Sequence, residues 1–246
     1  MLLKWAFWGP TGPRSQMLSC SIESFRRILG TSHEFVVTTP QPTPLRSFLP
    51  AYVSLLRCGA DDPFFSSTSL WRKWAPWPRL TRWSTELQVD IDVLLLRVPV
   101  LLLTLAEDPR AVAVMEEFPQ GQQIHGRYAE RVGPEYRLIN SGLLLQGAAV
   151  DLGHLLLAKY HESLQVEPSR RGYFDEQGAV AAAVSEAGSR GDARITILPR
   201  EDYPVIGDRE FLAGLLPPSP TLLHAAGPEH HAFRQVHGEC SCFVIP

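Results

Sequence analysis

Short apolar runs alternate with segments of helical periodicity along the first quarter of the chain. Lys4–Trp8 and Glu34–Thr38 have the length and composition of buried strands. Between them, apolar residues recur at helical spacing over Leu18–Leu29, and Leu45–Leu56 predicts a further helix. Strands and helices that alternate in this way are typical of parallel βαβ units.

The alternation continues along the chain and predicts one α/β domain with a mostly parallel sheet. The further predicted strands are Leu87–Leu96, Tyr136–Leu145 (interrupted by Asn140-Ser141-Gly142), Arg194–Leu198 and Thr221–His224, and the further predicted helices are Ala111–Phe118, Leu152–Leu164 and Asp175–Ala187. The length of 246 residues fits one large domain, and no repeat or low-complexity linker divides it. We expect a domain over residues 1–246, with its core in about residues 1–234 and a C-terminal tail over residues 235–246.

The composition excludes disorder and argues against nucleic acid as the main partner. The chain is 45% hydrophobic and 20% charged, which is enough apolar material for a sizeable core. Its net charge is −3 and it has no basic run. Four scattered cysteines do not form a disulfide framework, so reduced thiols are expected. A soft-metal site made by His237, Cys240 and Cys242 is the weaker alternative.

The sequence predicts a soluble, cytoplasmic protein. Its first residues lack the basic region, long apolar region and cleavage site of a signal peptide. The most apolar segment, Val93–Ala106, is broken by Arg97 and Pro99 and is too short to span a bilayer. Peripheral contact with a membrane stays open.

A tryptophan-rich segment, residues 61–83, interrupts the alternation. Its four tryptophans alternate with arginine and lysine, and prolines break it. Two interpretations stay open: a lid or packing segment, which the residue types favour, and a surface on which a base or a sugar stacks.

Two carboxylates, Asp90 and Asp92, lie inside the apolar run Leu87–Leu96. Side chains two residues apart on a strand share a face, so both are expected to point the same way. Burying two like charges together is costly, and a cation at a strand end relieves that cost. Oxygen ligands suit Mg²⁺ or Mn²⁺, which commonly bridge carboxylates to phosphates. The alternative without a metal is an acidic pair at a strand edge that has no functional role.

Three further groups of polar residues lie at the ends of predicted strands and helices: Asn140-Ser141-Gly142, Asp175-Glu176-Gln177 and His224. Each has a structural explanation. The first is a common turn or bulge, Asp175 suits a helix start, and a lone histidine is often a satisfied structural residue. Their occurrence together with the acidic pair, each at an element terminus, favours a functional site.

These stretches resemble the nucleotide-diphospho-sugar transferase superfamily, specifically A-type-fold glycosyltransferases with a DxD motif. The resemblance rests on Val89-Asp90-Ile91-Asp92-Val93, Ile139-Asn140-Ser141-Gly142, Phe174-Asp175-Glu176-Gln177 and His224-Ala225-Ala226-Gly227, and it extends from the first strand to about Arg234. It implies a single Rossmann-like domain and a sugar transferred from a nucleotide-diphosphate donor to a saccharide, lipid or protein acceptor. Retention of the anomeric configuration is favoured.

The resemblance also implies roles for individual residues. Asp92 and His224 would ligate Mn²⁺ or Mg²⁺, and Asp90 would contact the metal or the ribose. The donor or acceptor sugar would meet Asn140, Ser141 and Gly142, and the catalytic residues around the reacting sugar would be Asp175, Glu176 and Gln177. The nucleotide base would lie against the loop that begins at Trp8 and Gly9. One departure is a lysine that relatives carry after the His-x-x-Gly segment, for which this chain offers His230, His231 or Arg234.

Two other functions compete with this one. A phosphatase or phosphotransferase of the haloacid-dehalogenase type also uses Asp-x-Asp with Mg²⁺, but its nucleophile usually follows the first strand. The other is a non-catalytic module that binds a nucleotide sugar. Asp92 and His224 are both present, which favours an active enzyme.

Overall fold

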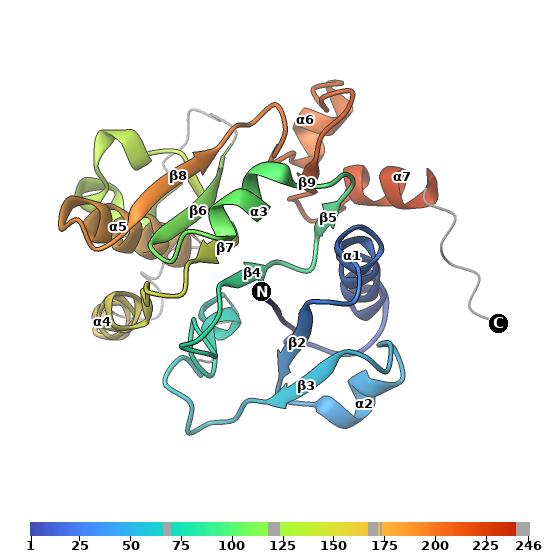
Figure 1. Cartoon of the computed structure of the whole chain (residues 1–246), viewed down its shortest axis with the longest axis horizontal. Coiled ribbons are helices and arrows are strands. Elements are labelled where there is room, and N and C mark those ends of the chain that lie inside the picture. Colours follow the sequence, from blue (N-terminus) through green and yellow to red (C-terminus); the bar gives the residue numbers. More distant parts are fainter. Residues whose placement is uncertain (66–69, 118–123, 167–171, 173, 240–246) are drawn as a thin grey trace.

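The computed structural model describes residues 1–65, 70–117, 124–166, 172 and 174–239, and it is built on two sheets (Figure 1). The larger sheet has seven strands in the order β3-β2-β1-β4-β7-β6-β8, and β7 alone runs against its neighbours. Its strands are β1 (Leu2–Ala6), β2 (Glu34–Thr39), β3 (Ser54–Arg57), β4 (Glu86–Val89), β6 (Ala111–Glu116), β7 (Ile139–Gln146) and β8 (Arg194–Leu198). The smaller sheet pairs β5 (Val93–Leu95) with β9 (Leu222–His224) antiparallel.

Helices cover both faces of the larger sheet. One face packs against α1 (Pro13–Leu29), α2 (Pro42–Arg46) and α3 (Val100–Ala106), and the other against α4 (Gly153–Leu164) and α5 (Asp175–Ser189). The helices α6 (Asp208–Leu212) and α7 (His231–Glu239) pack with the smaller sheet instead. Short 3₁₀ helices are η1 (Trp71–Trp74), η2 (Gly126–Arg131) and η3 (Pro134–Tyr136). Alternate strand residues enter different cores: Leu143 and Leu145 face the cluster that contains α1, whereas Leu144 faces the cluster that contains α4 and α5. This confirms the predicted α/β class with a mostly parallel sheet flanked by helices.

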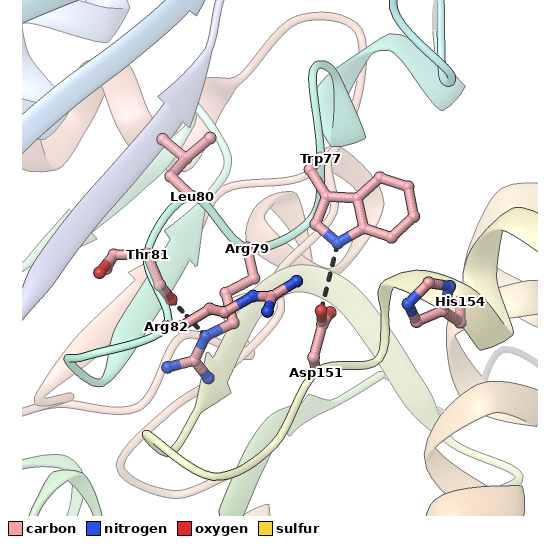
Figure 2. Close-up of a pocket in the computed structure, with 7 residues that line it drawn as sticks. All are labelled: Trp77, Arg79, Leu80, Thr81, Arg82, Asp151 and His154. Carbon is pink, nitrogen blue, oxygen red and sulfur yellow. Dashed lines mark hydrogen bonds between the residues drawn. The ribbon is translucent and has the colours of Figure 1, made fainter.

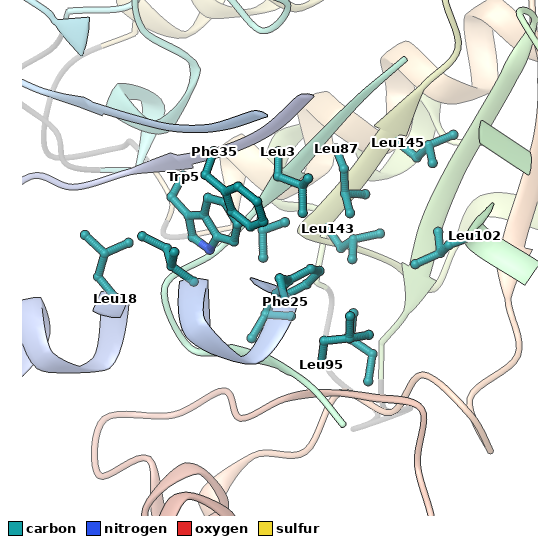
Figure 3. Close-up of a cluster of buried hydrophobic side chains, with 14 of the residues drawn as sticks. Leu3, Trp5, Leu18, Phe25, Phe35, Leu87, Leu95, Leu102, Leu143 and Leu145 are labelled. Atoms are coloured by element: carbon teal, nitrogen blue, oxygen red, sulfur yellow. The ribbon is translucent and has the colours of Figure 1, made fainter. Parts of the chain in front are cut away.

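The aromatic core around α1 also fixes the start of the smaller sheet (Figure 3). Trp5 is fully buried, and its ring stacks on Phe35 at 6.1 Å and meets Phe25 edge-on at 5.5 Å. Its indole nitrogen donates to Ser21 Oγ at 2.9 Å, and that hydroxyl donates to the Val93 carbonyl at 2.6 Å. Because Val93 directly follows the acidic pair, α1 helps to set where Asp90 and Asp92 lie.

Three predicted elements are wrong. Ala111–Phe118 is strand β6 rather than a helix, because β6 lies between β7 and β8 with both faces buried, and a short continuous apolar run does not distinguish the two states. Leu45–Leu56 is the end of α2, a turn and most of β3. Leu87–Leu96 is two strands in different sheets, joined by a turn over residues 90–92. The Asn-Ser-Gly segment lies inside β7, where the pairing with β6 shifts register between Val114–Leu144 and Met115–Asn140, as expected for a bulge.

The remaining predicted elements are confirmed, α4, α5 and β8 within one or two residues, whereas α1 begins five residues before the predicted Leu18 and β7 three residues after the predicted Tyr136. Cys20 and Cys58 are buried thiols outside any disulfide between described residues. Cys240 and Cys242 lie outside the described residues, so the soft-metal alternative stays untested. Within the described part of the chain, no helix combines the length and apolarity needed to cross a membrane.

A buried lysine ties the tryptophan-rich segment to the central sheet. Lys4, on β1, is fully buried, and its Nζ donates to the Trp77 carbonyl at 2.6 Å. Burial lowers the pKa of Lys4 to about 8, against the attraction of the Glu86 carboxylate. Between pH 8 and the ordinary lysine value of 10.5, Lys4 is therefore protonated in the unfolded chain but neutral in the folded protein.

Lys4 should make stability depend on pH in the alkaline range. Because its pKa is lowered on folding, its contribution is least favourable below pH 8 and improves by about 3 kcal/mol as the pH rises through 10.5. Urea unfolding of the wild type and Lys4→Met across this range measures the effect. Both proteins should carry Cys58→Ser, because burial raises the pKa of Cys58 to about 11 and its titration acts in the opposite direction. A pH-independent difference between the two would contradict the prediction.

Candidate active site

Asp90, Asp92 and His224 come together at one end of the larger sheet. Each offers one ligand atom, and these atoms lie within 4.8 Å of one another. Asp90 follows the carboxyl end of β4, and its N–H donates to the Gly142 carbonyl of β7 at 2.8 Å. His224 ends β9, pairs with Val93 of β5, and is followed by Ala225, whose N–H donates to the Asp92 carbonyl at 3.0 Å. The two sheets thus hold the three side chains from segments far apart in sequence.

The charges in this group support one another. His224 Nε2 lies 3.3 Å from Asp92 Oδ1, and His230 Nδ1 lies 3.6 Å from the other oxygen of Asp92. Burial alone would raise the pKa of Asp92, but the two imidazoles lower it. Burial alone would likewise lower the pKa of His224, but the Asp92 carboxylate raises it. Asp92 and His224 therefore stabilise each other's charged forms against the cost of burial.

Asn140 orients His224. Its Oδ1 lies 3.0 Å from His224 Nδ1 and accepts the Gly142 N–H at 2.7 Å. Its Nδ2 donates to Glu117 Oε2 at 2.7 Å and to Gln177 Oε1 at 3.2 Å. With Oδ1 as acceptor, His224 carries a proton on Nδ1, so Nε2 is the nitrogen that faces Asp92. A ligating histidine is commonly fixed by such a partner on its other nitrogen.

Lys73 is the cation of the site, and sequence reasoning missed it. It comes from η1, in the tryptophan-rich segment, and its Nζ lies 3.5 Å from Asp90 Oδ2 and 3.3 Å from Glu176 Oε1. It also donates to the hydroxyl and the carbonyl of Ser141, at 2.9 and 3.0 Å. Burial alone would lower the pKa of Lys73, but Asp90 and Glu176 raise it, so the ammonium stays charged.

Glu176, at the start of α5, is the most enclosed carboxylate next to Lys73. Only 4% of its side chain is exposed, and it accepts hydrogen bonds from Trp74 Nε1 at 2.8 Å and Ser141 Oγ at 3.1 Å. Burial raises the pKa of Glu176, although Lys73 opposes the shift. Gln177 joins the same network through Asn140. Glu117 was missed because the sequence predicts a helix there, whereas the structure places it just beyond the carboxyl end of β6.

Asp175 has its contacts elsewhere. Its carboxylate accepts hydrogen bonds from Arg127 Nε at 2.7 Å and the Gly172 N–H at 3.0 Å, and it pairs with Arg127 Nη2 at 2.6 Å. This ion pair joins η2 to the start of α5. Asp175 is buried, but its described partners do not include Asp90, Asp92 or His224, the group that could hold a metal.

Trp8 and Gly9 lie beyond the same sheet edge as Asp90. β1 and β4 are parallel with Trp5 opposite Val89, so the loop after β1 leaves the sheet beside the residue that follows β4. Trp8 stacks under the Arg72 guanidinium at 5.4 Å and meets Phe65 edge-on. A Cβ added to Gly9 would meet no atom within 4 Å, so the backbone there borders open space.

Comparison with known proteins identifies the fold. No protein-family model and no curated protein matches the sequence. Among solved structures, galactosyltransferase LgtC in complex with donor and acceptor sugar analogs is similar with a TM-score of 0.63 at 12% identity, covering 100% of this chain and 98% of that one. Mouse xyloside xylosyltransferase 1 is similar with a TM-score of 0.56 at 12% identity, covering 90% of this chain and 96% of that one. Glycosyltransferase GlyE of Streptococcus pneumoniae TIGR4 is similar with a TM-score of 0.59 at 15% identity, covering 98% of this chain and 60% of that one. The chain therefore has the fold of the A-type glycosyltransferases.

Proposed function

We propose that this protein is a metal-dependent glycosyltransferase that moves a sugar from a nucleotide-diphosphate donor to a saccharide, lipid or protein acceptor. The observation that carries the proposal is the group formed by Asp90, Asp92 and His224, with Lys73 3.5 Å from Asp90. Ligands of open α/β sheets bind beyond the carboxyl ends of the strands, where this group lies. The similarity to LgtC, solved with donor and acceptor sugar analogs, supports the same conclusion.

The donor atoms fit a divalent cation. Two carboxylates and one imidazole, whose lone pair is aimed by Asn140, form a mixed oxygen and nitrogen set. Carboxylates suit Mg²⁺ and Mn²⁺ alike, and the imidazole shifts the preference towards Mn²⁺. When bound, such an ion supplies Lewis-acid stabilisation of the charge that develops on the leaving diphosphate.

Lys73 and Glu176 provide the remaining charges for transfer. The Lys73 ammonium contacts Asp90 and Ser141 next to the proposed metal site. From either of these partners it can turn to an oxygen of the donor diphosphate. Its positive charge would then oppose the charge that builds up as the glycosidic bond breaks. The Glu176 carboxylate is held by Trp74 and Ser141, and it would stabilise oxocarbenium character on the sugar.

The other predicted site residues act mainly by positioning. The amide of Asn140 is occupied by four protein partners, so we assign it to the orientation of His224 rather than to sugar contact. Asp175 holds the start of α5 through Arg127 and thereby places Glu176 and Gln177. Trp8 and Gly9 border the nucleotide base. We keep retention of configuration and a single domain as parts of the proposal.

A panel of nucleotide sugars tests the function. Thermal unfolding should be followed with UDP-, GDP- and TDP-linked sugars, each with and without Mn²⁺. A donor that binds only the folded protein at a hundred times its dissociation constant stabilises it by about 2.7 kcal/mol. We expect one nucleotide class to shift the midpoint, and only with the metal. A shift with Mg²⁺ and a phosphate mimic, but with no donor, would favour a phosphatase. A shift with a metal-bound donor but no transfer to any acceptor would favour a binding module.

Gly142→Ala should weaken Mn²⁺ binding without disrupting the sheet. A Cβ at Gly142 would lie 2.3 Å from His224 Cε1 and 2.4 Å from its Nδ1, so the ring would have to move. Displacing a ligand or its orienting partner typically costs 10–100-fold in metal affinity, roughly the loss expected here. Isothermal titration with Mn²⁺ measures it. Gly59→Ala is the matched control, because a Cβ there meets no atom within 4 Å. Equal affinity in the two variants would rule out His224 as a ligand.

A further inference from the structure

The tryptophan-rich segment borders a hollow that does not include Asp90, Asp92 or His224 in its lining (Figure 2). It has a volume of about 260 Å³ and is lined by residues of this segment together with Asp151 and His154. The N–H groups of Leu80 and Thr81 donate to Glu86, the first residue of β4, whereas Asp90 follows the last. Four residues of strand separate these points, a distance of about 13 Å. The hollow is therefore a separate site at the opposite end of β4.

Buried charged side chains hold the walls of this hollow in place. All five N–H groups of Arg79 donate to backbone carbonyls, those of Thr81, Ser84, Gly147, Ala148 and Val150. Glu86 accepts two backbone N–H groups, and Lys4 binds the Trp77 carbonyl. Burying three charged side chains is costly unless each is fully paired. Here they fix residues 75–85, which form neither helix nor strand, in one geometry, which is the preorganisation that a binding site needs.

The lining combines aromatic surface with polar groups of both signs. The rings of Trp77 and His154 meet edge-on with centroids 5.3 Å apart and form a corner. The Trp77 indole packs so closely on α4 that a Cβ at Gly153 would lie 2.3 Å from its Nε1, and this nitrogen donates to Asp151 at 3.3 Å. Arg82 is exposed beside this corner (Figure 2). Aromatic walls with a few placed polar groups are typical of small-molecule sites.

The charges decide the class of ligand. An anion would meet the Asp151 carboxylate, and the N–H groups of Arg79 are already occupied by carbonyls. A cation would meet Arg79 and Arg82. A neutral ring with many hydroxyl groups avoids both conflicts, because its C–H face packs on the aromatic corner while its hydroxyls pair with Asp151 and Arg82.

We propose that this hollow binds one neutral pyranose ring of a glycan, at a site separate from the site of transfer. Its volume is below the range of pockets for drug-sized ligands and suits a single ring. Trp83 follows Arg82 of the lining, its backbone N–H donates to Thr81 Oγ1 at 3.1 Å, and 91% of its surface is exposed. An indole this exposed is unusual on a folded protein and offers a second surface for a neighbouring sugar.

Saturation-transfer NMR with methyl pyranosides tests this site. The probes are the methyl glycosides of glucose, galactose, mannose, xylose and N-acetylglucosamine, for which binding in the millimolar range is expected. At least one should bind, and His154→Ala and Arg82→Ala should each weaken it about tenfold. His161→Ala is the matched control, because it is an exposed histidine of the same helix outside the hollow, and it should leave binding unchanged.

Asp92→Asn separates this proposal from the proposed function. Binding of the pyranoside should persist in that variant, which lacks a member of the metal-ligating group, whether or not the protein is a transferase. Loss of binding in Asp92→Asn would place the sugar in the transfer site and overturn the proposal. It would equally be overturned if none of the glycosides bound, or if inorganic phosphate bound in their place and was lost in Arg82→Ala.

Discussion

Asp92→Asn is expected to lower Mn²⁺ affinity and sugar transfer by at least about a thousandfold while the fold stays intact. Opposite unit charges 4 Å apart near a protein surface attract by about 4 kcal/mol, which corresponds to this factor. Asp92 faces both His224 and His230, and the amide of asparagine carries no charge to pair with them. Isothermal titration with Mn²⁺ and release of the nucleoside diphosphate measure the two effects.

Two further measurements isolate the role of Asp92. Asp61→Asn, an exposed carboxylate outside the group, should leave both quantities unchanged. The pKa of His224 should fall in Asp92→Asn, because the carboxylate raises it in the wild type, and nitrogen chemical shifts of the imidazole report this without any metal. Full turnover in Asp92→Asn would show that the assigned role is wrong.

Lys73→Met is expected to reduce transfer by about 10²–10³-fold, as is typical when one group that stabilises developing charge is removed. It should also destabilise the metal-free protein by about 3 kcal/mol, because Glu176 would be left buried without its cation. Lys73→Arg retains the charge and should recover most of the stability. Chemical unfolding and the rate of donor turnover measure the two effects.

A double variant distinguishes two roles of Lys73. In Lys73→Met/Glu176→Gln the buried carboxylate is gone, so stability should recover relative to Lys73→Met. Binding of the nucleoside diphosphate identified in the panel should remain weak, because the ammonium that reaches its phosphates is still absent. Recovery of nucleotide binding in the double variant would mean that Lys73 serves only to neutralise Glu176.

The acidic pair was found in the sequence for a reason that was only partly correct. Asp90 and Asp92 do converge, but in a turn between two sheets and not on one face of a strand. The strand β6 was mistaken for a helix because both of its faces are buried, so its apolar pattern lacks the period of two. That error concealed Glu117, which lies directly after this strand.

Lys73 shows what a linear pattern cannot supply. It lies 68 residues from Ser141 and 17 from Asp90 in the chain, yet it contacts both. Nothing in its own neighbourhood distinguishes it from Arg72, because both lie in η1 between buried tryptophans. Only the path of an irregular segment decides which of two adjacent cations reaches the carboxylates. Asn140, in contrast, is singled out by the sequence, but three of its four hydrogen bonds depend on partners from elsewhere in the chain: Glu117 just beyond β6, Gln177 of α5 and His224 of β9.

The position of His224 on β9 ties the site to the completion of the chain during synthesis. The seven-stranded sheet is complete at Leu198, whereas strand β9 begins only at Leu222. A polypeptide released by the ribosome between these points would have every strand of the larger sheet. It would lack the partner of β5 and the imidazole that faces Asp92. Premature termination in this interval would therefore yield a chain with every strand of the larger sheet but without one of the three proposed metal ligands.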